Sequence, residues 1–424
     1  MLATLRQRNF GLLWSAGLIS LAGDWMLRIA LPIYVYQLTG SALATSTMLI
    51  AGMLPDLLFG SIAGVFVDRW DRKRTMVICN LLLAIGLLPL LAVRSAEQIW
   101  LLYLVAFFES TIAQFFGPAE NALLPQLVGE DQLIAANSLN SLNNNLARLI
   151  GPALGGLVAG LLGIVGVALI DSATFLLAAA LIVLIRGAFK PTKSPAADAP
   201  GSAAQAWAAI PREWLAGLRL IRRERVVMIL FALIAITSLG EGVFGVLFVV
   251  FVNRVLGGGA QEIGWLMSAQ AVGGLIGGVL VGWLGNKASA IALIGLGAVA
   301  FGLIDLAIFN YPAFLPGFTL ALILFVAVGI PGVAMMTGMN TLLQSAVADE
   351  YRGRVFGTYS MTGALLALIG AALAGTLADR VGAVTLLNIQ GVVYVAAGLL
   401  VPALLRSAQR AALLHQRSAM ADQV

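Results

Sequence analysis

The stretch NALLPQLVGEDQLIAANSLNSLNNNLARLIGPALGGLVAGLLG, residues 121–163, occurs a second time as NTLLQSAVADEYRGRVFGTYSMTGALLALIGAALAGTLADRVG, residues 340–382. The two copies align without a gap, and about a third of their positions are identical. The matched positions include an asparagine and three glycines: Asn121/Asn340, Gly151/Gly370, Gly156/Gly375 and Gly163/Gly382. Lipid contact does not select these residue types, so shared apolar composition does not explain the match. At nearly the same offset three further pairs follow: Gly64/Gly278, Lys73/Lys287 and Asp24/Glu241. The chain therefore consists of two related halves, a plan known for transporters.

The amino-acid composition indicates a membrane protein. Of 424 residues, 60% are hydrophobic and 11% are charged, which is more apolar surface than a water-soluble fold can bury. The first apolar stretch is too long for a cleaved signal peptide, so we interpret it as a span. Twelve stretches are long and apolar enough to cross a bilayer as helices. They begin near Gly11, Ala44, Thr75, Gln98, Asn137, Ile164, Val226, Gln261, Ala288, Phe314, Gly353 and Ala383.

Lysine and arginine residues alternate between the two sides of these spans. One set of loops holds nearly all of them, whereas the other set holds only Arg94, Arg254 and Arg380. By the positive-inside rule the basic side is cytoplasmic, which places both termini there and requires an even number of spans. We therefore expect an all-α polytopic membrane protein with twelve transmembrane helices in two pseudo-symmetric six-helix bundles. Anchoring at a charged membrane surface explains the net charge of +5, so no nucleic-acid partner is expected.

Four regions follow from this pattern. An N-terminal bundle is expected over 1–186, a cytoplasmic linker over 187–225, a C-terminal bundle over 226–405 and a basic cytoplasmic tail over 406–424. Within the linker, Trp214, Leu218 and Ile221 share one face of a helical repeat. We interpret this segment as an amphipathic helix on the cytoplasmic membrane surface; a solvated linker helix is the alternative.

Residue counts exclude several kinds of chemistry. The chain has one cysteine, Cys79, and one histidine, His415, which lies in the tail. A disulfide framework, a cysteine- or histidine-based metal site and a Ser-His-Asp triad are therefore excluded. No G-x-x-x-x-G-K-[ST] stretch is present, which disfavours an ATP-driven pump. We expect a protein that is not an enzyme and binds no cofactor or metal.

The short turn between the second and third spans, GVFVDRWDRKR at residues 64–74, is densely charged. Its basic residues could serve only to hold orientation, but acidic residues add little to the positive-inside rule. Gly64, one helical turn before Asp68, would let a neighbouring helix approach closely. The stretch resembles the loop signature G-x-x-x-D-R-x-G-R-[RK] of the major facilitator superfamily, with Asp71 in place of the inner glycine. The resemblance implies a cytoplasmic latch between the bundles, formed by Gly64, Asp68, Arg69, Arg72 and Lys73.

A second signature lies in the fifth span, where RLIGPALGG covers residues 148–156. It resembles the G-P-x-x-G-G element of proton-coupled exporters in the same superfamily. A proline bends a helix and glycines permit close packing, so plain helix packing is the alternative interpretation. The matching residues are Arg148, Gly151, Pro152, Gly155 and Gly156.

A third resemblance indicates a particular branch of the major facilitator superfamily. FFGPAENALLPQLVGEDQLIAANSLNS, residues 115–141, and LAGDWMLRIALPIYVYQLTGSA, residues 21–42, are similar to the enterobactin-exporter and macrolide-efflux branch. This resemblance covers nearly the whole chain. It implies a bacterial inner-membrane exporter that exchanges its substrate for protons, with the proton gradient as its energy source.

Several charged residues lie inside the predicted spans, where they are costly and point to function. Asp24 and Arg28 are one helical turn apart and can form an ion pair, which could also be purely structural. We predict Asp24 and Glu109 as the proton-titrating pair, with Arg28 tuning Asp24 and with Glu241 and Asp56 as further candidates. We expect structural roles for Asp171 and Asp305. An acid whose surroundings alternate between apolar and cationic takes up a proton on one side and releases it on the other.

Substrate contacts are expected to be apolar and aromatic. The candidates are Trp25, Tyr34, Phe108, Phe115, Phe244, Met335, Met336 and Met339, although each could serve only in helix packing. The methionine cluster suggests an adaptable wall, because methionine side chains repack easily.

Together these features predict a secondary active transporter that exports a hydrophobic or amphipathic small molecule in exchange for protons. Its expected partners are the substrate, protons and the lipid bilayer, and we expect a monomer. One alternative keeps the fold and moves lipid or lysolipid. The other is a transporter-like receptor that moves nothing.

Overall fold

The computed structural model describes residues 2–187, 189, 212, 214–215, 218–219, 221, 224–315, 317–347 and 349–421. All regular elements among them are helical. The helices of the first half are α1 (Leu2–Leu5), α2 (Arg8–Thr39), α3 (Ala42–Val67), α4 (Arg72–Gly86), η1 (Leu88–Ala92), η2 (Ala96–Gln98), α5 (Ile99–Leu127), η3 (Glu130–Gln132) and α6 (Leu133–Val183). Those of the second half are α8 (Arg225–Arg254), α9 (Ala260–Leu284), η4 (Gly285–Lys287), α10 (Ala290–Asn310), η5 (Tyr311–Ala313), α11 (Phe318–Ala346), α12 (Asp349–Val381) and α13 (Ala383–Ala421).

Eleven helical segments of the described chain are long and apolar enough to cross a membrane. The longest, α6, has 51 residues and would measure roughly 75 Å if it were straight, more than twice the thickness of a bilayer core. It is broken at Gly163, whose φ of 63° and ψ of −167° are not helical. Its two arms therefore supply two spans, and the second arm begins at Ile164. The expectation of twelve transmembrane helices is met in this way.

The chain divides into two compact units. The first comprises residues 1–210 together with 252–268, and the second comprises 211–251 together with 269–424. The main division lies inside the predicted linker, whereas the end of α8 and the start of α9 pack with the first unit. Each unit is described below by itself.

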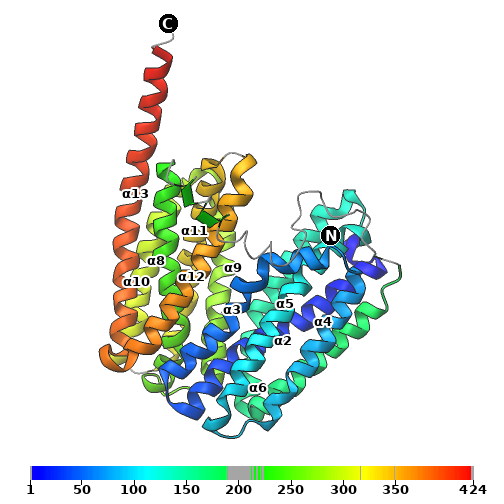
Figure 1. Cartoon of the computed structure of the whole chain (residues 1–424). Helices are drawn as coiled ribbons and strands as arrows, with labels where there is room; N and C mark the ends of the chain where they lie inside the picture. Colours follow the sequence, from blue (N-terminus) through cyan, green and yellow to red (C-terminus); the bar gives the residue numbers. More distant parts are fainter. Residues whose placement is uncertain are drawn as a thin grey trace. The chain divides into compact units, whose positions relative to one another are not determined.

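In the first unit the helices α2, α4, α5 and α6 lie alongside one another (Figure 1). Close approach of α6 to α2 depends on glycine. A Cβ atom at Gly155 would lie 2.8 Å from both the Cα and the carbonyl oxygen of Met26, closer than van der Waals contact permits. The buried side chains form two cores. One is centred on Met26, Leu87 and Val167, and the other on Phe10, Met76 and Leu123.

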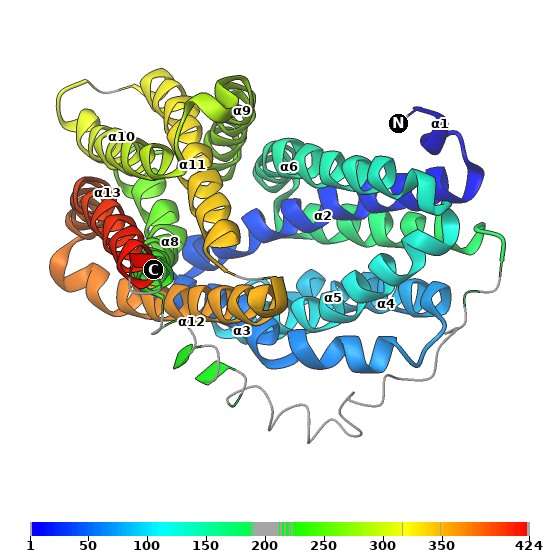
Figure 2. The same cartoon turned by 90° about the horizontal axis from the view of Figure 1, so that it is seen from above.

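In the second unit α10 packs between α11 and α13 (Figure 2). Small residues again allow the contact, because a Cβ atom at Gly302 would lie 2.5 Å from the carbonyl oxygen of Gly391. Helix α13 continues through Ala421, so residues 406–421 of the predicted tail extend the last helix.

Most of the predicted linker and its amphipathic helix lies outside the described residues. Three side chains of its predicted apolar face are described. The Trp214 indole N–H donates a hydrogen bond of 3.1 Å to the Thr362 hydroxyl of α12. Ile221 is buried in the core of the second unit, and Leu218 packs against that core. These three side chains therefore contact protein.

Candidate functional site

Three carboxylic side chains from three helices gather in the first unit. Asp24 lies on α2, Glu109 on α5 and Asp171 on the second arm of α6. Glu109 interacts electrostatically with both of the others, and Asp171 interacts with Asp24. We call these residues the carboxyl cluster.

Glu109 is buried without a hydrogen-bond partner among the described residues. Its side chain is 8% exposed, and neither carboxylate oxygen has a hydrogen-bond partner among the described residues. It occupies space that Gly86 of α4 leaves free, since a Cβ atom there would lie 2.8 Å from Oε1 of Glu109. A buried polar group without a partner is costly, and inside a membrane such a group indicates function.

Asp171 is completely buried. Its Oδ1 accepts a hydrogen bond of 3.0 Å from the Thr174 hydroxyl, whereas Oδ2 has no partner among the described residues. The carboxyl group lies against the backbone of α2, because a Cβ atom at Gly23 would lie 2.0 Å from Oδ1. Glycine at position 23 is therefore what lets this carboxyl group reach α2, next to Asp24.

Arg28 connects the carboxyl cluster to a fourth acid. Its guanidinium group interacts electrostatically with both Asp24 and Asp56 and lies 5.6 Å from the centre of the Trp25 ring. Asp56, on α3, accepts hydrogen bonds from the Ser110 hydroxyl and the Gln114 amide of α5. A polar network thus runs through α2, α3, α5 and α6.

The network contains four of the five residues predicted for proton coupling: Asp24, Arg28, Asp56 and Glu109. Sequence reasoning placed Asp171 outside this group with a structural role, but the structure places it inside the cluster. The internal repeat contains a signal for Asp171. The offset of 219 residues that aligns Gly151 with Gly370 also pairs Asp171 with Gln390, so both halves have a polar side chain at this position of a predicted span.

The fifth predicted residue, Glu241, lies on α8 in the second unit. It is exposed and interacts electrostatically with Tyr394 of α13, as does Asp305 of α10. The Tyr394 hydroxyl donates a hydrogen bond of 3.2 Å to the carbonyl oxygen of Thr237. Asp305 is 3% exposed, and its Oδ2 has no partner among the described residues. The second unit therefore has its own smaller polar group.

The predicted latch residues form the end of α3 and the start of α4. The Asp71 carboxylate caps α4 by accepting a hydrogen bond of 2.9 Å from the backbone N–H of Arg74. The Lys73 ammonium group donates to the carbonyl oxygens of Val183 and Ile185, at 2.8 and 2.7 Å, and so caps the end of α6. Arg72 is buried, and its backbone N–H donates to the carbonyl oxygen of Phe189.

The remaining latch residues are Gly64, Asp68 and Arg69. Asp68 and Arg69 are exposed, and no described atom of the first unit lies within 4 Å of a Cβ atom built at Gly64. Close packing inside the unit therefore does not explain this glycine. The latch contact between the bundles stays a prediction.

The glycines of the exporter signature have two sets of contacts. A Cβ atom at Gly151 would lie 2.4 Å from Cβ of Trp25 on α2, and Gly155 meets Met26 as described above. On the other side, a Cβ atom at Gly156 would lie 2.5 Å from the carbonyl oxygen of Ala260, at the start of α9. Arg148 is exposed. The motif therefore packs the first arm of α6 tightly between two helices.

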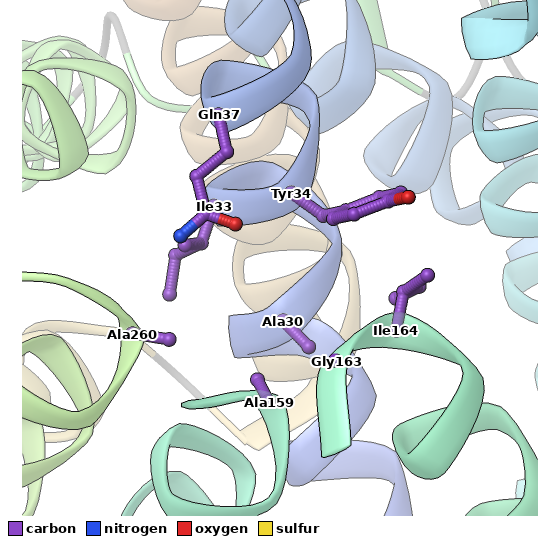
Figure 3. Close-up of a pocket in the computed structure, with 8 residues that line it drawn as sticks. All are labelled: Ala30, Ile33, Tyr34, Gln37, Ala159, Gly163, Ile164 and Ala260. Atoms are coloured by element: carbon purple, nitrogen blue, oxygen red, sulfur yellow. The ribbon is translucent and has the colours of Figure 1, made fainter. Parts of the chain in front are cut away.

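The described residues of the first unit include one small pocket, shown in Figure 3. Ala30, Ile33, Tyr34 and Gln37 of α2, Ala159, Gly163 and Ile164 of α6, and Ala260 line it. Its volume is about 50 Å³, whereas sites for drug-sized compounds measure roughly 300 Å³ or more. Of the predicted substrate residues only Tyr34 lines it, and its hydroxyl donates to the carbonyl oxygen of Val93 at 3.2 Å.

The other predicted substrate residues have identifiable neighbours. Met335 and Met339 are 8% and 4% exposed and belong to the core of the second unit. These two methionine residues therefore do not form the adaptable wall predicted from the sequence. Met336, which is 64% exposed, is the member of the cluster that remains accessible. Four aromatic residues pack locally: Trp25 beside Gly151, Phe108 beside Gly86, Phe115 stacked on Trp70, and Phe244 stacked on Phe248.

Within the part of the chain that the structure describes, no group of three or more His, Cys, Asp or Glu side chains could hold a metal ion. The carboxyl cluster is therefore not arranged as a metal site.

A comparison with protein families decides the identification. Residues 1–423 match the model of the transmembrane secretion effector family of the major facilitator superfamily. The chain belongs to this family. Its members are transporters and not enzymes, as expected from the sequence.

The chain is similar to bacterial efflux proteins over most of its length. It is 29% identical to macrolide efflux protein A of Streptococcus pyogenes over 385 residues, 88% of this chain and 90% of that protein. It is 30% identical to the multidrug efflux pump Tap of Mycolicibacterium fortuitum over 384 residues, 87% of this chain and 88% of that pump. The predicted resemblance to macrolide-efflux proteins is confirmed, and these bacterial relatives place the chain in the inner membrane.

Solved structures confirm the fold. The nucleoside transporter NupG has a TM-score of 0.74 at 12% identity and covers 95% of this chain and 100% of its own. A POT family transporter has a TM-score of 0.73 at 13% identity and covers 95% of this chain and 96% of its own. At these identities the likeness shows the major facilitator fold alone.

Proposed function

We propose that this major facilitator transporter exports a hydrophobic or amphipathic small molecule from the cytoplasm in exchange for protons. The observation that carries the proposal is the carboxyl cluster, in which Glu109 and Asp171 are buried with carboxylate oxygens that lack hydrogen-bond partners among the described residues. Buried acids inside a membrane are energetically costly, and a role in binding and releasing protons would explain their presence.

The mechanism follows from the neighbours of Asp24. The positive charge of Arg28 favours the ionised form of a nearby carboxyl group, whereas an apolar environment favours the neutral form. A change in exposure or in the position of Arg28 therefore alters the proton occupancy of Asp24 and, through electrostatic interaction, that of Glu109 and Asp171. If substrate and proton cannot both occupy the transporter in one state, alternating access exchanges one for the other.

The substrate class rests on the relatives. Macrolide efflux protein A and the pump Tap, named for macrolides and for multiple drugs, support an exported compound that is large and partly apolar. Exposed Met336 and the part-buried aromatic residues Trp25 and Phe244 are candidate contacts. The proposal includes siderophore-like compounds.

The energy source in this proposal is the proton gradient, without a cofactor. In this proposal the transporter acts as a monomer. The distribution of lysine and arginine supports placing both of its termini in the cytoplasm. The turn at residues 64–74 then faces the cytoplasm, where Asp68 and Arg69 are exposed and available for the latch.

A broad efflux screen in a pump-deficient bacterial host tests the proposal. Cells expressing the wild type should accumulate less of at least one amphipathic drug than cells expressing Asp24→Asn, and a protonophore should abolish the difference. Efflux that survives the protonophore would contradict proton coupling. Transport of labelled lysolipid, with no drug exported, would favour the lipid-transporting alternative, and no transport of any kind would favour the receptor.

A further inference from the structure

We propose that Asp171 is a third proton-binding group of the transporter, which exchanges a proton with Glu109 and Asp24. The inference rests on the proposed proton exchange and extends it to a residue for which the sequence alone predicts a structural role. In each exchange an O–H bond breaks on one carboxyl group and forms on a carboxylate oxygen of another, so the number of protons is conserved.

The position of Asp171 suits this role. Its side chain is completely buried, so it reaches no bulk water directly, and Oδ2 is left without a partner by the described residues. Its Oδ1 lies where a side chain at Gly23 would otherwise be, one residue from Asp24. A proton on Asp171 can therefore leave only through neighbouring polar groups.

The groups around Asp171 are few. Helix α2 contributes Asp24 and, beyond it, Arg28, while α5 contributes Glu109. On its own helix, Thr174 donates a hydrogen bond, and the neighbouring Ser172 hydroxyl donates to the carbonyl oxygen of Ala84 on α4. The α4 residues Gly86 and Ala84 have no titratable side chain. The buried titratable side chains described on that helix are the guanidinium group of Arg72, at its start, and the thiol of Cys79.

The two halves of the chain allow the structural alternative to be examined. In the second half, Gln390 occupies the position that corresponds to Asp171, and it packs on Gly240 as Asp171 packs on Gly23. A Cβ atom at Gly240 would lie 3.1 Å from Cγ of Gln390. Glu241 follows Gly240, just as Asp24 follows Gly23.

This comparison shows whether Asp171 is needed for helix packing or for binding a proton. In the second half the neutral amide side chain of Gln390 on α13 packs against α8, in the same way as Asp171 on α6 packs against α2. Close contact within either helix pair therefore does not require an acid. The buried Oε1 of Gln390 also lacks a hydrogen-bond partner among the described residues. What the first half gains from aspartate is a group that can bind and release a proton.

Three interacting carboxyl groups titrate as one coupled set. Removing one member therefore changes the titration of the others, and this effect can be measured without transport. Asp171→Asn keeps the size and polarity of the side chain and removes its proton. Asp305→Asn is the matched control, because Asp305 is also buried but belongs to the second unit.

The experiment uses the full-length protein in liposomes without substrate. Dicyclohexylcarbodiimide reacts with protonated carboxyl groups in apolar surroundings, and peptide mass spectrometry reports the extent of Glu109 labelling as a function of pH. We expect Asp171→Asn to shift the midpoint of Glu109 labelling by about one pH unit or more, and Asp305→Asn to leave it unchanged. An unchanged midpoint in Asp171→Asn would overturn the inference.

A second measurement applies if Asp171→Asn does not fold. In the wild type, a carbodiimide adduct on Asp171 that decreases as the pH rises supports the inference. Labelling of Glu109 with no adduct on Asp171 at any pH contradicts it.

The failure of this inference can be told apart from failure of the proposed function. Coupled transport by the wild type with an unchanged labelling midpoint in Asp171→Asn would reject the role of Asp171 alone. A shifted midpoint in a protein whose substrate moves no protons would reject the exchange mechanism and leave Asp171 as a coupled proton-binding group.

Discussion

The carboxylate of Asp71 accepts a hydrogen bond of 2.9 Å from the backbone N–H of Arg74 and so caps the first turn of α4. The related superfamily signature has glycine at this position, and the cap explains why an aspartate can replace it. Asp71 is therefore a structural residue, in contrast to the exposed Asp68 three residues earlier.

Replacing Asp71 by alanine removes the cap and should lower the free energy of unfolding by about 1 kcal/mol. Asp71→Asn should behave like the wild type, because asparagine caps helices about as well as aspartate. Thermal unfolding of the purified protein in detergent provides the measurement. Equal melting temperatures for the alanine variant and the wild type would show that the hydrogen bond contributes nothing.

Asp68→Asn should slow transport with little change in substrate affinity, because Asp68 is exposed at the end of α3 and in our proposal acts only in the latch. The initial rate of efflux from energised vesicles and its dependence on substrate concentration separate turnover from affinity. Asp71→Asn is the matched control, since it makes the same chemical change in the same turn. Equal turnover for Asp68→Asn and the wild type would dismiss the latch.

The fold could be predicted from the sequence because it depends on long-range regularities. Apolar stretches of sufficient length give twelve spans, the alternating basic loops require an even number of them, and the internal repeat divides them into two related halves. Even the break between the fifth and sixth spans was visible, because Gly163 lies between two apolar stretches and recurs as Gly382.

The candidate site could be predicted only in part. Charged residues inside spans stand out by composition, so Asp24, Arg28 and Glu109 were found. Which acids come together depends on helix rotation and on gaps left by glycines such as Gly23 and Gly86, and neither is visible along one stretch of sequence. For the same reason Asp171 was missed, and Met335 and Met339 were expected in a cavity wall although they pack in a core.

Asp24→Asn should abolish proton-coupled efflux while the protein still folds. The change removes the acid that interacts with both Arg28 and Asp171 but keeps the size of the side chain. Drug accumulation in cells, with and without a protonophore, measures coupling, and size-exclusion chromatography confirms folding. Glu97→Gln, in the exposed η2 segment, is the control. Proton-driven efflux at the wild-type rate in Asp24→Asn would refute its role.

Gly23→Ala should disrupt the carboxyl cluster without removing any charge. The added methyl group would overlap Oδ1 of Asp171, so the carboxyl group or α2 must move, at a cost of about 1–3 kcal/mol. Gly52→Ala on α3 is the matched control, because its Cβ atom would lie 4.0 Å from Ala106, an ordinary contact. Melting temperature and efflux rate should both fall for Gly23→Ala and stay unchanged for Gly52→Ala. A fully active and stable Gly23→Ala would show that the position of Asp171 is unimportant.

Gly155→Ala tests whether the exporter signature acts through helix packing. Its Cβ atom would lie 2.8 Å from the backbone of Met26, and backbone cannot rotate out of the way as a side chain can, so we expect a loss of about 1–3 kcal/mol in unfolding free energy. Gly160→Ala, five residues further along α6, would place its Cβ atom 3.8 Å from Gln261 and should be tolerated. Melting temperatures of the two variants give the comparison. Because both substitutions make the same chemical change in one helix, equal stability would mean that the close approach of α6 to α2 is not what the motif provides.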